Sequence, residues 1–179
     1  MKKFCTVLVC LLVLLVCGCQ HPPAVSTPYS NNEYGFSVDY PAGWTVEDSK
    51  IPDPNFFIIS FSEGKPYEGV FITIVGYLDT PEYKDTLEIL PRWLLIDEFK
   101  DAKGFKLLKE EVITVNGFEA KEFIYTYGSN GEYKRARVYC LVGSSYYVVS
   151  YLGTIGDSEY EKYYSCFGWM VNTLKFGVR

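Results

Sequence analysis

The side chains that could do chemistry are few, and their spacing matches none of the common catalytic arrangements. The chain contains a single histidine, His21. No serine or cysteine in the later part of the chain therefore has an imidazole base, and the GxSxG pattern of serine hydrolases is missing. We expect no catalytic activity, and an unrecognised hydrolase is the least favoured of the functions considered.

Acidic side chains and thiols also lack the spacing of a metal site. Asp97-Glu98 and Glu110-Glu111 are adjacent pairs, and neighbours on a helix or strand point in different directions, so neither pair can flank one bond. Other loop acids stand singly: Asp53, Glu63, Asp79 and Asp157. They do not form an EF-hand loop, and no CxxC is present in the chain. We expect neither a metal nor another cofactor.

One cysteine, Cys19, has a clear chemical context. Two lysines precede an apolar run from Phe4 to Val16, which has the proportions of the hydrophobic region of a secretory signal. The run ends in Val16-Cys17-Gly18-Cys19, which resembles the lipobox of bacterial-type lipoproteins. The resemblance implies that residues 1–18 are a cleaved signal peptide and that Cys19 carries a lipid.

A plain secretory signal and an uncleaved anchor helix are the alternatives, and each would still place the rest of the chain outside the cytoplasm. Residues 19–32 are polar, rich in proline and without periodicity. They are predicted to be the lipidated cysteine and a flexible tether. The expected location is the cell membrane, with a lipid anchor on the extracytoplasmic face.

The composition restricts the partners. Of the 179 residues, 48 % are apolar and 22 % are charged, which is typical of a globular domain. The formal net charge of −5 disfavours nucleic acid, because phosphate contacts need clustered lysine and arginine. We expect two partners, the membrane through the lipid and an envelope protein, and the sequence assigns no residues to the second.

Residues 33–179 are predicted to form one domain with an antiparallel meander. Asn116-Gly117 favours a type I′ hairpin between strands at 105–115 and 118–127. Two further strands at 132–142 and 146–152 continue the meander, since glycine-containing turns separate them.

The remaining segments predict the layers. Strands at 56–62 and 69–78 are apolar on both faces, which favours cover on both faces of the sheet. Amphipathic helices are predicted at 82–100 and at 158–174. The expected fold class is therefore α+β, a mostly antiparallel sheet sandwiched by helices.

Three segments resemble PsbP-like domains. Tyr34 to Trp44, with the order Tyr-Gly-Phe-Ser-Val-Asp-Tyr-Pro-Ala-Gly-Trp, looks like the family's opening. Val115-Asn-Gly117 looks like its central hairpin, and the Tyr-rich segment from Tyr160 to Phe176 looks like its last helix. The resemblance implies an α/β/α sandwich over most of residues 33–177.

The resemblance also implies a function without catalysis. The plant members are extrinsic subunits of photosystem II with a calcium-linked role, which is the alternative function. The lipobox and the lack of histidine in the domain argue against transferring that role. The favoured function is a non-catalytic, membrane-tethered lipoprotein that acts as a protein-binding or assembly module.

Three features of the domain have two interpretations each. Lys134, Arg135 and Arg137 suit a charged edge or solvent strand, with an anion or partner contact as the alternative. The tyrosines of the meander suit core packing, with a face for a protein or a sugar as the alternative. Cys140 and Cys166 are expected near each other, and both a disulfide and two free thiols remain open.

Overall fold

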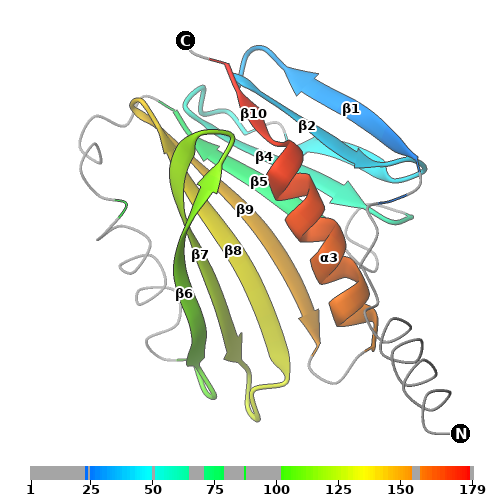
Figure 1. Ribbon diagram of the computed structural model, residues 1–179, viewed down its shortest axis with the longest axis vertical. Helices are drawn as coiled ribbons and strands as arrows, with labels where there is room; N and C mark the ends of the chain where they lie inside the picture. The colour runs from blue at the N-terminus through cyan, green and yellow to red at the C-terminus, as the bar shows by residue number, and fades with distance from the viewer. Residues whose placement is uncertain are drawn as a thin grey trace, which may run out of the picture.

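The computed structural model describes residues 23, 25–49, 51–64, 71–78, 87, 102–154 and 158–177, which form two antiparallel sheets and one helix (Figure 1). The strands are β1 (Ser26–Asn31), β2 (Phe36–Pro41), β3 (Thr45–Ser49), β4 (Phe56–Ser62), β5 (Phe71–Tyr77), β6 (Lys106–Val115), β7 (Phe118–Tyr127), β8 (Tyr133–Val142), β9 (Ser145–Thr154) and β10 (Lys175–Phe176). The helix is α3 (Ser158–Thr173).

The main sheet has the strand order β3-β4-β5-β9-β8-β7-β6, and every pair in it is antiparallel. Strands β6 to β9 form the meander that the sequence predicts. Asn116 and Gly117 have φ angles of 47° and 86°, as a type I′ turn between β6 and β7 requires. Strand β9 then pairs with β5 and joins the meander to the β3–β5 half of the sheet.

One face of the main sheet is covered by α3 and by a small sheet with the order β1-β2-β10 (Figure 1). The helix begins at Ser158, as predicted, and buries its apolar side: Tyr160, Tyr163, Phe167, Met170 and Val171. The Tyr147 hydroxyl on β9 donates to the Tyr34 carbonyl at 2.9 Å, and so connects the main sheet to the turn before β2.

The expected fold class, an α+β sheet sandwiched by helices, is wrong. The described chain is a β-rich fold in which one helix and a second sheet share one face of the main sheet. The expectation rested on strands that are apolar on both faces, a pattern that favours helices or loops on each side of the sheet. Instead, aromatic side chains of the opposite face pack on each other across the strands, in a cluster of Phe123, Tyr125, Tyr139, Tyr146 and Val148.

Three other expectations concern particular segments. Residues 26–31, assigned from the sequence to the tether, form β1, which pairs with β2 over its whole length. Strand β8 lies between β7 and β9, so the interpretation of its basic residues as an edge strand is wrong. The predicted helix at 82–100 and the signal peptide lie outside the described residues. Within the described ranges, no helix has the length and apolar character to cross a membrane.

Gly76 on β5 gives the first prediction, because it faces the ring of Phe57 on β4. A Cβ at position 76 would overlap that ring. Phe57 is fully buried and stacks on Tyr34 with a centroid distance of 4.1 Å, so its ring has no space to move into. We expect Gly76→Ala to lower the free energy of unfolding by about 1–3 kcal/mol, measured by urea denaturation.

Gly168→Ala in α3 is the matched control. A Cβ at position 168 would meet nothing within 4 Å. Since alanine has a higher helix propensity than glycine, we expect Gly168→Ala to raise the free energy of unfolding by about 0.5–1 kcal/mol. Equal effects of the two substitutions would contradict the Gly76–Phe57 packing.

Candidate functional site

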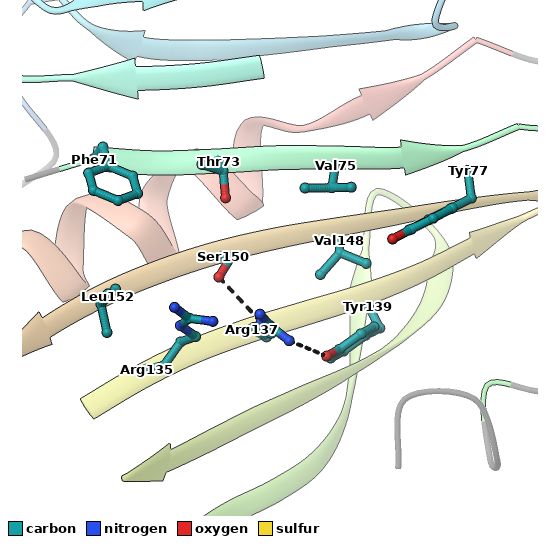
Figure 2. Close-up of a pocket in the computed structure, with 10 residues that line it drawn as sticks. All are labelled: Phe71, Thr73, Val75, Tyr77, Arg135, Arg137, Tyr139, Val148, Ser150 and Leu152. Carbon is teal, nitrogen blue, oxygen red and sulfur yellow. Dashed lines mark hydrogen bonds between the residues drawn. The ribbon is translucent and has the colours of Figure 1, made fainter. Parts of the chain in front are cut away.

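A hollow lies at the centre of the main sheet, on the face opposite α3 (Figure 2). We call it the arginine pocket. It has a volume of about 220 Å³ and is formed by β5, β8 and β9. Its lining residues are Phe71, Thr73, Val75, Tyr77, Arg135, Arg137, Tyr139, Val148, Ser150 and Leu152.

The strand register brings these side chains together. Ser150 on β9 is the partner of both Thr73 on β5 and Arg137 on β8, so the three form one row across the sheet. Every second residue of a strand points to the same face. The next row of the pocket therefore consists of Val75, Val148 and Tyr139, and Leu152 is the partner of Arg135.

Arg137 occupies the middle of the pocket (Figure 2). Its Nε donates to Ser150 Oγ at 3.4 Å, and its Nη1 donates to the Tyr139 hydroxyl at 3.3 Å. Its guanidinium carbon lies 6.0 Å from the centre of the Tyr125 ring. Two hydroxyl groups and an aromatic ring thus hold a permanently charged side chain in a fixed orientation.

Arg135 is oriented toward the neighbouring strand β7. Its Nη2 donates to the Tyr127 hydroxyl at 3.2 Å, and its guanidinium carbon lies 5.4 Å from the centre of the same ring. Lys134 points to the opposite face, where its Nζ lies 3.4 Å from Glu161 Oε1 and 4.3 Å from the centre of the Tyr160 ring. The basic stretch of the sequence therefore divides between the two faces, and only its arginines reach the pocket.

The tyrosines of the meander are mainly core residues, as the sequence favoured. The buried ones are Tyr125, Tyr139, Tyr146, Tyr147 and Tyr151. Burial raises the pKa of Tyr146 far above its ordinary value, so this phenol stays neutral. Tyr133 is exposed by 42 %, and Tyr127 is half-buried beside it with a ring distance of 5.4 Å.

A second group of charges lies on the helix side of the sheet. Lys109 Nζ lies 2.6 Å from Glu111 and 2.5 Å from Glu122, and the Tyr164 hydroxyl donates to Glu122 at 3.0 Å. Hydrogen bonds to Glu111 and Glu122 raise the pKa of Lys109, and burial and the Glu122 charge raise the pKa of Tyr164 to about 12. These groups pair with one another, and their contacts connect α3 to strands β6 and β7.

Paired acids behave as the sequence predicts where they are described. Glu111 contacts Lys109 on the helix side, whereas Glu110 lies 3.7 Å from Lys121 on the other face. The single loop acid Asp53 accepts from the backbone N–H of Asn55 at 2.9 Å, and Glu63 contacts the Tyr163 hydroxyl. Among the described residues, no three histidine, cysteine or acidic side chains group as a metal site.

Cys140 and Cys166 are not joined by a disulfide. Cys140 is fully buried on β8, and burial raises its pKa to about 12. Cys166 on α3 is half-buried and lines a smaller hollow with Trp44 and Tyr163. Cys19, His21, Asp79, Asp97-Glu98 and Asp157 lie outside the described residues.

Solved structures share this fold. Over 89 % of the chain, the structure is similar to the cyanobacterial PsbP protein (CyanoP) of Synechocystis sp. PCC 6803, with 16 % identity, a TM-score of 0.63 and 96 % of that protein covered. It is also similar to the Ran-binding protein Mog1p of Saccharomyces cerevisiae, with 12 % identity, a TM-score of 0.56, and coverage of 85 % of this chain and 95 % of that one. The chain therefore has a PsbP/Mog1-like fold. No protein-family model and no curated protein sequence matches it.

The thiols give the second prediction. At about pH 8, a thiol with the pKa of Cys140 is about one part in ten thousand thiolate, and it is also buried. We expect iodoacetamide to label Cys166 in the folded protein and Cys140 only after unfolding in urea, measured by peptide mass spectrometry. Rapid labelling of Cys140 in the folded protein, or a disulfide-linked peptide of the two, would contradict the burial of a free thiol.

Proposed function

We propose that this protein is a non-catalytic binding module, tethered by a lipid on Cys19 to the extracytoplasmic face of the cell membrane, and that it holds an envelope protein partner. The observation that carries the proposal is the arginine pocket. It places two guanidinium groups and the hydroxyls of Thr73 and Ser150 in one hollow on a rigid sheet. Such a set of donors recognises a ligand and orients it.

The chemistry of the pocket favours binding over catalysis. An enzyme that transfers protons needs a group whose pKa lies near the working pH. The described lining residues contribute arginines, hydroxyls and apolar groups, and an arginine keeps its proton in proteins. Arg137 can therefore hold an anion, but it cannot act as a base.

The fold gives the proposal a second support. Yeast Mog1p, a protein of similar structure, is a Ran-binding protein. A PsbP/Mog1-like fold thus serves there to bind another protein. The likeness to cyanobacterial PsbP is one of fold at 16 % identity, so we do not extend the proposal to a calcium-linked role at a photosystem.

Site-specific photocrosslinking in native membranes tests the binding function. A photoreactive phenylalanine analogue at Leu152, inside the pocket, should form an adduct with a partner. The same analogue at Ser26, an exposed position on the small sheet, is the control. We expect the Leu152 adduct to be lost when Arg135 and Arg137 are both changed to alanine, with the circular dichroism spectrum unchanged. Adducts of equal strength from Ser26 and Leu152 would contradict binding at the pocket.

Fractionation of cells tests the tether, which gives the fourth prediction. We expect the full chain to be processed and recovered in the membrane fraction, and the Cys19→Ser variant to lose the lipid and the processing that follows lipidation, because lipidation needs the Cys19 thiol. Ser30→Ala, an exposed substitution in β1, is the control and should stay in the membrane. A Cys19→Ser protein that is processed and held as tightly as the parent would contradict lipidation.

A further inference from the structure

The geometry points to a ligand class for the arginine pocket: a carboxylate joined to an apolar group, with Arg137 holding the carboxylate. This inference rests on the proposed function, because it names what the same pocket recognises.

The donors around Arg137 are arranged for an anion. Ser150 Oγ accepts a hydrogen bond from Arg137 Nε, so the hydroxyl keeps its own hydrogen to donate to a ligand. Thr73 lies beside Ser150 in the same row of the sheet, and its hydroxyl oxygen points toward β9 (Figure 2). A carboxylate next to Arg137 would thus meet a guanidinium and two hydroxyl donors.

The scaffold favours a carboxylate over a phosphate group. Sites for phosphate commonly use backbone N–H groups at helix N-termini or in nests of successive amides. Strands β5, β8 and β9 each pair with a strand on both sides, so their ladders occupy the backbone N–H groups along the pocket. The hydrogen-bond donors for a bound anion are therefore side chains. The planar guanidinium of Arg137 matches the planar geometry of a carboxylate.

The rest of the pocket is apolar. Val75 and Val148 form the row next to Ser150, and Phe71 and Leu152 lie at the other side of it (Figure 2). A volume of about 220 Å³ equals that of roughly seven water molecules. The pocket therefore suits one carboxylate and a group the size of a single apolar side chain.

This chemistry has two sources, a free small carboxylic acid and the C-terminal carboxylate of a protein whose last residue is apolar. Both present one carboxylate beside one apolar group. They differ in whether further residues of a chain follow the bound group, and the experiment separates them on that ground.

Isothermal titration calorimetry of the full chain in phosphatidylcholine nanodiscs tests the inference. The probes are 3-phenylpropionate, its neutral amide, acetate and inorganic phosphate. We expect binding of 3-phenylpropionate on the order of 10- to 100-fold tighter than that of the amide, since a charged hydrogen-bonded pair is lost in the amide. Acetate should bind more weakly than 3-phenylpropionate, because it leaves the apolar wall uncovered.

Variants assign the effect to the pocket. Arg137→Ala should weaken 3-phenylpropionate on the order of tenfold or more, and Arg137→Lys should restore part of the affinity, because the charge returns without the fork. The matched control is Lys134→Ala, which removes one positive charge from the same strand on the opposite face, where Lys134 contacts Glu161. It should leave the affinity unchanged. The comparison of acid with amide needs no variant, so it holds even where Arg137→Ala unfolds.

Two further titrants identify the source. A tetrapeptide ending in phenylalanine with a free carboxylate is compared with the same peptide as a C-terminal amide. Tighter binding of the free peptide than of 3-phenylpropionate assigns a chain terminus, and the reverse assigns a small acid; both support the inference. Equal binding of acid and amide, tighter binding of phosphate, or an equal effect of Lys134→Ala and Arg137→Ala overturns it. Binding of the acid without a crosslinked protein at Leu152 would support the ligand class and contradict the protein partner.

Discussion

The pairing of β9 with β5 on one side and β8 on the other is the constraint on which the molecule depends. These ladders join residues near position 75 to residues near positions 138 and 149, and they combine the two halves of the chain into one sheet. The register then decides the face of every side chain. Ile74, Val149 and Val138 enter the core under α3, while Thr73, Ser150 and Arg137 lie on the opposite side. The core and the pocket are therefore products of the same set of hydrogen bonds.

The two faces differ in how they exclude water. On the face that α3 and the small sheet cover, aromatic rings stack closely, and Phe57 stacks on Tyr34 and Phe36 with centroid distances of 4.1 and 5.5 Å. On the opposite face, Phe123 and Tyr139 meet edge to face at 5.6 Å, and the arginines lie against tyrosine rings. Such packing holds a guanidinium in a more defined place than a flexible arginine on the surface would have.

Local signals made much of the fold predictable. Asn116-Gly117 identified the β6–β7 hairpin, and the glycine-containing turns separated the further strands of the meander. The fold class was not predictable in the same way, because the pattern of an apolar strand shows that a face is buried but not what buries it. Covering one face with a second sheet requires β1, β2 and β10, and the two residues of β10 carry no periodic signal. The arginine pocket depends on non-local register. The sequence shows Arg135 and Arg137 on one strand, but nothing in it places Ser150 or Thr73 beside them.

The early start of β1 would limit how far the domain can move from a membrane to which Cys19 was attached. Strand β1 begins at Ser26, so only six residues separate it from Cys19. Even fully extended, the chain between these two positions spans about 25 Å. With a lipid at Cys19, the edge strand β1 of the small sheet would therefore stay within about 25 Å of the lipid headgroups. The main sheet would then remain in a thin layer above the bilayer, and a partner would have to place its binding group within that layer.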